Sequence, residues 1–233
     1  MSETQSITPA GTPPVTAPPI GAPPISAPPI SARRAKTRQR LLDAARDVFA
    51  REGFGRSTVE QVCEAAGFTR GAFYSNFTSL DELFLEMWAQ ESASMLSRLQ
   101  DVAEEDIEDV RDVRAGVERV LAVLPVDPDW FQITSEFTAH AVRTPGLARV
   151  MATREEAIQA ALLPVIDHLL ARIDRRVTDR TALGQSLVAV YDGTNVQLAV
   201  EPDNLDAHRH RVDLFTLLVE HYSEPVRRRK FLV

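Results

Sequence analysis

The stretch TRGAFYSNF, residues 69 to 77, combines hydrogen-bond donors with small side chains and contains no acid. The guanidinium of Arg70 has the donors to bond the edge of a guanine, and Ala72 can contact a thymine methyl group. Hydroxyl and amide side chains bond phosphates and bases, and a stretch without carboxylates does not repel phosphate. We therefore expect DNA contacts from Thr69, Arg70, Gly71, Ala72, Tyr74, Ser75 and Asn76.

Two short helices joined by a turn must position these side chains. Thr58 and Gln61 form a capping-box pattern at the start of the first helix, and Gly67 is typical of its end. In the second helix, Phe73 and Phe77 are spaced to pack on a small core. This arrangement is that of a helix-turn-helix, whose second helix enters the major groove. Thr58 is also expected to present the start of its helix to a phosphate.

The charge of the chain is unevenly distributed. Residues 31 to 80 hold nine Arg or Lys and five acids, a net charge of +4, whereas the whole chain has a net charge of -7. Because phosphate affinity comes from local cations, only this first part is expected to meet DNA. A basic arm at its start is expected to follow the DNA backbone or to enter the minor groove, and it consists of Arg33, Arg34, Lys36 and Arg38.

Residues 37 to 88 resemble the DNA-binding domain of the tetracycline-repressor (TetR) family. The matching landmarks, in order, are Ala45, Phe49, Gly53-Phe54, Thr58, Ala66-Gly67-Phe68 and Gly71-x-Phe73-Tyr74-x-x-Phe77. The resemblance implies a dimer of all-α subunits, in which a variable ligand-binding domain controls the spacing of two recognition helices. It also implies that Tyr74 contacts phosphate. Leu80 departs from the family, which usually has a phosphate-contacting Lys there.

The spacing of apolar residues is helical from Arg33 onward, and no strand signal competes with it. We expect an all-α fold of about nine helices. It comprises a Pro-rich tail (1–32), a three-helix helix-turn-helix DNA-binding domain (33–80), a larger helical effector-binding and dimerisation domain (81–224) and a basic tail (225–233). The helices are expected at 34–51, 59–66, after Thr69, after Ser79, and at 105–124, 129–143, 146–174 with a bend at Pro164, 180–200 and 205–222.

Two further helix ends have recognisable signals. Gly53 is expected to end the first helix in a left-handed conformation, and Ser79 with Glu82 is expected to form a second capping box. Cys63 is interpreted as a small buried packing residue rather than a redox switch, because no second thiol is present.

The first tail contains four proline pentads, GTPPV, TAPPI, GAPPI and SAPPI, at residues 11 to 30. Paired prolines at this density favour an extended, polyproline-II-like segment. A spacer is favoured over a docking site for a partner protein. The run RRRK at 227 to 230 is interpreted as a solvated tail rather than as a second DNA contact.

Aromatic and polar residues in the acidic part of the chain describe either a small-molecule site or a core. They are Trp130, Phe137, His140, Tyr191 and Asn195, and packing is favoured over effector contact for each. In the resembled family, the last two helices form a dimer interface, and burial within the monomer is the alternative. The apolar residues that suit this interface are Leu187, Val190, Leu198, Leu214, Leu218 and Val219.

No metal, cofactor or catalytic site is expected. The spacing of His140, His168, His208, His210 and His221 does not suit a metal site, and His140 and His168 are interpreted as partly buried. The sequence has no phosphate-binding Gly-rich loop, GxSxG or HExxH motif, which argues against an enzyme. Without a membrane span or a signal peptide, we expect a cytoplasmic protein.

These observations predict a sequence-specific transcriptional regulator that binds double-stranded operator DNA. The leading hypothesis is a homodimeric repressor released from a palindromic operator by a small hydrophobic or amphipathic effector. The alternative is a regulator without a small effector, controlled by a protein that docks on the proline pentads.

Overall fold

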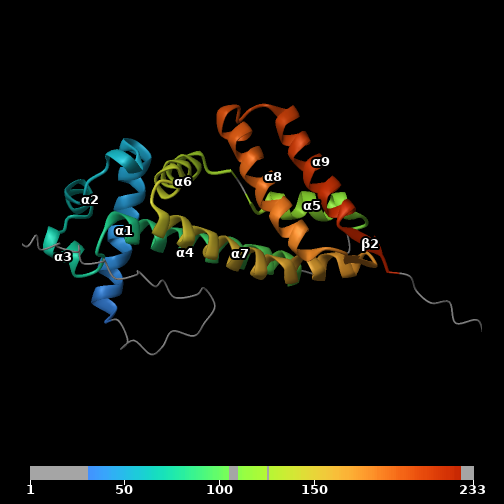
Figure 1. Cartoon of the computed structure of the whole chain (residues 1–233), viewed down its shortest axis with the longest axis horizontal. Helices are drawn as coiled ribbons and strands as arrows, with labels where there is room; N and C mark the ends of the chain where they lie inside the picture. Colours follow the sequence, from blue (N-terminus) through green and yellow to red (C-terminus); the bar gives the residue numbers. More distant parts are fainter. Residues whose placement is uncertain (1–30, 105–109, 125, 227–233) are drawn as a thin grey trace, which may run out of the picture.

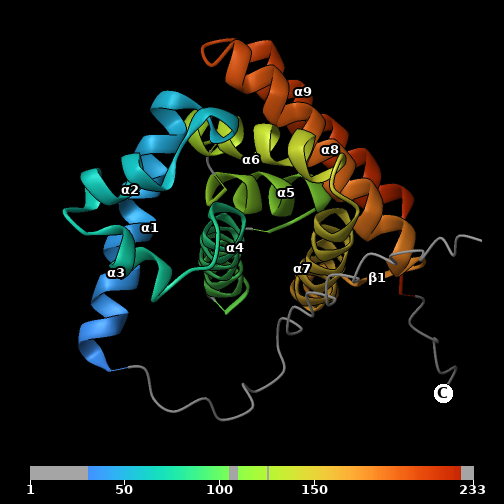
Figure 2. The same ribbon diagram turned by 60° about the vertical axis from the view of Figure 1, so that its left-hand side comes forward.

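The computed structural model describes residues 31–104, 110–124 and 126–226. Helices α1 (Ala32–Glu52), α2 (Val59–Ala66) and α3 (Arg70–Tyr74) form one end of the molecule, and a 3-10 turn at Phe54–Arg56 joins α1 to α2 (Figure 1). Helices α4 (Leu80–Glu104) and α7 (Pro145–Arg172) lie side by side along the longest axis (Figures 1 and 2). The proline pentads and the RRRK run lie outside the described residues.

The other helices complete a bundle around α4 and α7. They are α5 (Val113–Ala122), α6 (Pro128–Ala141), α8 (Arg180–Val200) and α9 (Leu205–His221). The described residues thus contain nine α-helices, which confirms the predicted all-α fold with an N-terminal helix-turn-helix. Helix α7 continues through Pro164, where a bend was expected. Within the described residues, no helix combines the length and hydrophobicity that a bilayer crossing requires.

Two expectations about secondary structure were wrong. Strands β1 (Arg175–Val177) and β2 (Ser223–Pro225) form an antiparallel pair in which Arg176 lies opposite Glu224. Three-residue strands are too short to show a period of two in the sequence. Helix α5 begins at Val113, not near residue 105, because the Asp112 carboxylate caps it by accepting a hydrogen bond from the Ala115 N–H at 2.9 Å.

Local capping signals position α2 and α3. The predicted capping box of α2 is confirmed, since Thr58 Oγ1 accepts from the Gln61 N–H and Gln61 Oε1 accepts from the Thr58 N–H. Gly67 ends α2 in the left-handed conformation, with φ 69° and ψ 36°. These two ends fix the turn from which α3 starts.

The helix ends predicted at Gly53 and Ser79 differ from the expectation. Gly53 has a positive φ of 84°, but its ψ of 144° is not that of a left-handed helical residue. A Cβ at this position would lie 2.7 Å from Oε2 of Glu136 on α6, so a side chain there would also displace Glu136. At the start of α4, Ser79 Oγ accepts from the Glu82 N–H, but the Glu82 carboxylate accepts from Thr78 rather than from the Ser79 backbone.

The first hydrophobic core joins helices α1–α3 to the bundle. Phe49, Phe73 and Phe77 are fully buried, and Phe84 of α4 and Phe137 of α6 belong to the same core. The rings of Phe84 and Phe137 are stacked with centroids 3.7 Å apart. Since burial of aromatic rings is a major source of stability, α4 and α6 are bound tightly to α1–α3. A second core lies between α5, α7, α8 and α9.

Candidate DNA-contacting surface and bundle cavity

Helix α3 divides its side chains as the sequence predicted. Thr69 caps the helix by accepting from the Ala72 N–H at 3.2 Å, and Phe73 is fully buried. Arg70, Gly71 and Tyr74 are exposed, with half of the Tyr74 side chain accessible to solvent. Thr58, at the start of α2, is exposed as well. These residues form a surface that a DNA groove can reach.

Arg70 is not a free cation on this surface. Its Nη1 lies 2.8 Å from Oε1 of Glu60 on α2, and its guanidinium lies 5.8 Å from the centroid of the Tyr74 ring. Glu60 is not among the site residues expected from the sequence, although an acid in the first turn of a helix is a recognisable local signal, because it complements the helix dipole. A base or phosphate contact by Arg70, as the sequence predicts, would therefore have to replace its ion pair with Glu60.

Asn76 does not lie on the exposed face, so its predicted position was wrong. Only 8% of the residue is exposed. Its Nδ2 donates to the Ala72 carbonyl at 2.7 Å, and its Oδ1 accepts from Nε of Arg34 at 3.4 Å. An amide at the C-terminus of a helix satisfies carbonyl groups that lack an intrahelical partner. Ser75 remains exposed, although its hydroxyl also donates to the Ala72 carbonyl.

The basic residues ahead of residue 40 belong to α1 and do not form a separate arm, which corrects the expectation. Arg34 donates to the Ser75 carbonyl at 3.0 Å, and Arg38 donates to the Asn76 carbonyl at 2.6 Å. Both cations therefore hold the C-terminal end of α3, where unpaired carbonyls attract positive charge. Arg33 and Lys36 are exposed on α1.

Leu80 packs against the first core and is partly buried. It lies at the first position of α4, directly after Ser79. The residue that replaces the family's usual Lys thus makes an apolar contact within the subunit.

The bundle encloses a partly open cavity of about 770 Å³, within the range typical of small-molecule sites. Helices α4 to α9 all contribute to its wall, which includes Trp130, Tyr191 and Asn195. Two other predicted effector contacts, Phe137 and His140, do not line it. Phe137 is fully buried in the first core, and His140 packs its ring near Phe54, with Nε2 at 3.3 Å from Oδ1 of Asp81.

Acidic side chains are prominent in the cavity wall. They are Glu91, Asp112, Asp127, Glu155 and Asp192, and Arg98 is the one basic residue that the described part of the chain contributes to the wall. Burial raises the pKa of Asp192, and burial together with the charge of Asp192 raises the pKa of Glu155. Acids on helices usually mark a solvated face, so their positions in the sequence do not indicate a place in a cavity wall.

The predicted dimer residues divide into two groups. Leu187, Leu198 and Val219 are buried within the subunit, and Leu187 and Val219 line the cavity, so they do not form an exposed face. Val190, Leu214 and Leu218 are only partly buried. The exposed apolar residues of α8 and α9 are instead Val196, Val200, Leu205 and Leu217.

Among the described residues, no cluster of three or more His, Cys, Asp or Glu is arranged to hold a metal ion. His208 contacts the Pro202 carbonyl at 2.9 Å, and His168 is exposed rather than partly buried as expected. Cys63 is buried, and burial raises the pKa of its thiol, with the charge of Glu60 adding to the effect. Its protonated form is favoured, in agreement with a packing role.

Both parts of the chain match known protein families. Residues 41–87 match the family model of bacterial regulatory proteins of the tetR family, and residues 109–221 match that of the C-terminal domain of BetI-type transcriptional repressors. A protein of Escherichia coli K12 named a probable acrEF/envCD operon repressor is 43% identical over 56 residues, which cover 24% of this chain and 26% of that protein. The transcriptional repressor Rv1474c of Mycobacterium tuberculosis is 29% identical over 127 residues, covering 54% and 63%. The chain thus matches less than two thirds of the length of these relatives.

Solved structures share the fold of the whole subunit. Salmonella enterica GusR superimposes with a TM-score of 0.64 at 23% identity, covering 79% of this chain and 96% of GusR. A transcriptional regulator of Saccharomonospora viridis in complex with choline has a TM-score of 0.60 at 17% identity, covering 83% and 100%. Together with the helix-turn-helix geometry and the two family matches, these similarities show that the chain belongs to the TetR family and is a DNA-binding transcriptional regulator.

Proposed function

We propose that this regulator is a homodimeric repressor that leaves a palindromic operator when a small hydrophobic or amphipathic molecule binds in the bundle cavity. The cavity is the observation that carries the proposal, because its wall shares residues with the core of the DNA-binding end. Phe84 lines the cavity and is buried in the first core, and Trp130 lines the cavity and packs against the same core. A ligand that moves either ring therefore acts on the packing of α1–α3.

DNA contact is assigned to the exposed face of α3 and the start of α2. In this proposal, the residues that enter the major groove are Arg70, Gly71, Ala72 and Tyr74, with Thr69 and Ser75 at the two ends of α3. Thr58, Arg33 and Lys36 are positioned for phosphate contacts. In a dimer, two such helices reach successive major grooves ~34 Å apart, so the operator is expected to be a palindrome.

The dimer is supported by exposed apolar side chains on the last two helices. Val196, Val200, Leu205 and Leu217 expose 47 to 73% of their surface, although they lie on well-formed helices. Apolar residues gathered on one pair of helices favour association with a second copy.

The effector is supported by the size and lining of the cavity. Trp130 and Tyr191 supply aromatic walls, and the Asn195 side chain also accepts a hydrogen bond from buried Arg211 at 2.9 Å. A regulator of the same fold was solved with choline bound, which supports a ligand-binding role for this type of bundle.

The experiment has two steps. Genome-wide mapping of bound sites in the source organism identifies the operator, and the neighbouring genes suggest candidate effectors. Operator binding is then measured with each candidate, and we expect at least one to weaken it. If small molecules bind the cavity but never weaken operator binding, the repressor-release model is wrong. The alternative, control by a protein docked on the proline pentads, would then be favoured.

A further inference from the structure

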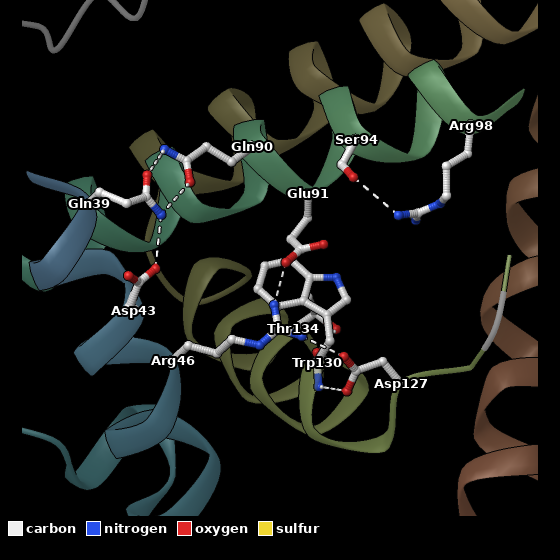
Figure 3. A network of polar contacts seen from close by, with 10 residues as sticks. All are labelled: Gln39, Asp43, Arg46, Gln90, Glu91, Ser94, Arg98, Asp127, Trp130 and Thr134. Atoms are coloured by element: carbon white, nitrogen blue, oxygen red, sulfur yellow. Dashed lines mark hydrogen bonds and ion pairs between the residues drawn. The ribbon is translucent and has the colours of Figure 1, made fainter. Parts of the chain in front are cut away.

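One cation of the DNA-binding end lies at the edge of the cavity. Arg46, on α1, forms ion pairs with Glu91 of α4 and with Asp127, the N-cap residue of α6 (Figure 3). Its guanidinium also lies 5.4 Å from the centroid of the Trp130 ring. We call this group of Arg46, Glu91, Asp127 and Trp130 the Arg46 clamp.

The three partners of Arg46 are all part of the cavity wall, whereas Arg46 itself is not. Two carboxylates and an aromatic ring are the groups that recognise organic cations in proteins. The Arg46 guanidinium shows that a cation with delocalised charge fits among them. The clamp is therefore a cation site that opens onto the cavity and is occupied by a side chain of the DNA-binding end.

The rest of the cavity wall favours a cation over an anion. The basic residue of the wall, Arg98, already donates to protein acceptors, namely Ser94 Oγ and the Val123 carbonyl, both at 3.1 Å. Glu155 and Asp192 have no hydrogen bond or ion pair with any residue that the structure describes. Carboxylates without partners in a partly desolvated site are stabilised by a cationic ligand and repel an anionic one.

Between α1 and α4, the described residues show three polar connections, of which the clamp is one. Gln39 and Gln90 exchange hydrogen bonds of 3.3 and 3.5 Å, and Arg38 lies 3.4 Å from Glu86 (Figure 3 shows the glutamine pair). Among the ion pairs of the described residues, only the clamp also ties α1 to α6. Losing the clamp would leave α1 attached to α4 but would release its polar connection to α6.

We propose, on the basis of the function proposed above, that the effector is a hydrophobic organic cation that replaces the Arg46 guanidinium between Glu91, Asp127 and Trp130. The cation binds only the state in which Arg46 has left the clamp, so its binding shifts the population toward that state. Helix α1 then changes its orientation relative to α6 and carries α2 and α3 with it. By linkage, operator DNA lowers the affinity for the cation by the same factor.

The charge of the ligand is tested with two ions of nearly the same shape and opposite charge, tetraphenylphosphonium and tetraphenylborate. Binding of each to the full chain is measured by calorimetry. We expect tetraphenylphosphonium to bind about tenfold or more tightly than tetraphenylborate, a difference of ~1.4 kcal/mol. If tetraphenylborate binds equally well or better, or if neither ion binds, the proposed cation site is wrong.

Competition with Arg46 is tested by Arg46→Met, which removes the internal cation and keeps an unbranched apolar stem like that of Arg. This variant should bind tetraphenylphosphonium about tenfold more tightly than the wild type, because no side chain has to be displaced. Arg51→Met removes a charge from the same helix at an exposed position and should leave the affinity unchanged. The triple variant Arg46→Met, Glu91→Gln, Asp127→Asn leaves no unpaired charge in the clamp. Its preference for the cation should fall well below that of Arg46→Met, with Glu155 and Asp192 retaining the remainder. If Arg46→Met binds tetraphenylphosphonium with the same affinity as the wild type, the proposed competition between Arg46 and the cation is wrong.

Coupling to DNA is measured with the mapped operator. Tetraphenylphosphonium should weaken operator binding by the wild type and by Arg51→Met, and it should have little effect on Arg46→Met. If Arg46→Met responds as strongly as the wild type, the clamp is not the connecting element. If the cation binds as predicted but no ligand weakens operator binding by the wild type, the cation site stands and the proposed repressor function fails.

Discussion

Arg70 of the recognition helix α3 is held by Glu60 of α2, with 2.8 Å between the guanidinium Nη1 and the carboxylate Oε1. Both side chains are more than half exposed, so the ion pair contributes little to folding. We expect its effect to be on DNA binding, because the carboxylate would compete with DNA for the same donors.

Glu60→Gln should therefore tighten operator binding by up to ~1 kcal/mol, the range measured for exposed ion pairs. Arg70→Ala should cost ~1 to 3 kcal/mol and relax the preference at one symmetric base position per half-site. In the Arg70→Ala background, Glu60→Gln should lose most of its benefit, which a double-mutant cycle measures. Glu64→Gln, on the same helix and exposed, is the control for general loss of negative charge. Equal gains from both Gln variants would show that Glu60 does not act through Arg70.

Leu80→Lys should restore the phosphate contact implied by the family resemblance. Operator and non-specific binding should tighten together, because a phosphate contact carries no base information. The log K versus log[salt] slope should steepen by ~0.9 per subunit, or roughly 2 for a dimer. Leu80 packs against the first core, so thermal unfolding must first show that the variant is folded. An unchanged slope in a folded variant would mean that residue 80 does not face phosphate.

Deletion of residues 1 to 30 should leave folding and operator affinity in vitro nearly unchanged. The segment contains a single charged side chain, Glu3, and so adds no phosphate contact. Operator titration of the full and shortened chains checks this. A tenfold loss of affinity, ~1.4 kcal/mol, would show that the proline pentads take part in DNA binding.

Stability should depend on the ionisation of Glu155 and Asp192. Partial desolvation raises the pKa of both carboxyl groups above their values in the unfolded chain, although Asp192 stays exposed and Glu155 is half-buried, so the folded state binds protons more tightly. The stabilisation of the folded state by these two carboxyl groups is fully present below their ordinary pKa in the unfolded chain. It is lost as the pH rises through their raised pKa in the folded state. Asp192→Asn should thus raise the melting temperature at neutral pH and lose this advantage in acid. Asp203→Asn, between α8 and α9 and outside the cavity wall, is the control for removing one negative charge. A stabilisation by Asp192→Asn that is independent of pH would contradict the assignment.

Leu217→Asp should weaken the dimer, because Leu217 is 60% exposed on α9 among the apolar residues that we assign to the interface. Sedimentation at several protein concentrations measures the dissociation constant. Val142→Asp introduces the same charge at an exposed Val beyond the end of α6 and should leave the dimer intact. A Leu217→Asp protein that remains as dimeric as the control would exclude this surface as the interface.

Local sequence signals determined the elements that position the DNA-contacting surface. Thr58, Gln61 and Gly67 define the ends of α2 through contacts within a few residues, so their effect is readable without the fold. The same holds for Thr69 at the start of α3 and for the division between Phe73 and the exposed residues beside it. The helix-turn-helix and the family could therefore be predicted from the sequence.

The tertiary structure alone decided which polar residues face DNA, the core or the cavity. Asn76 was predicted to be exposed but is buried against α1. Its hydrogen-bond partner Arg34 lies 42 residues earlier in the chain, so the sequence near Asn76 does not indicate this contact. Arg46 meets Glu91 and Asp127 across 45 and 81 residues. Pairings over such distances depend on how α1, α4 and α6 pack, and the spacing of residues within one helix carries no information about them. The cavity has the same origin, because six separate helices supply its wall.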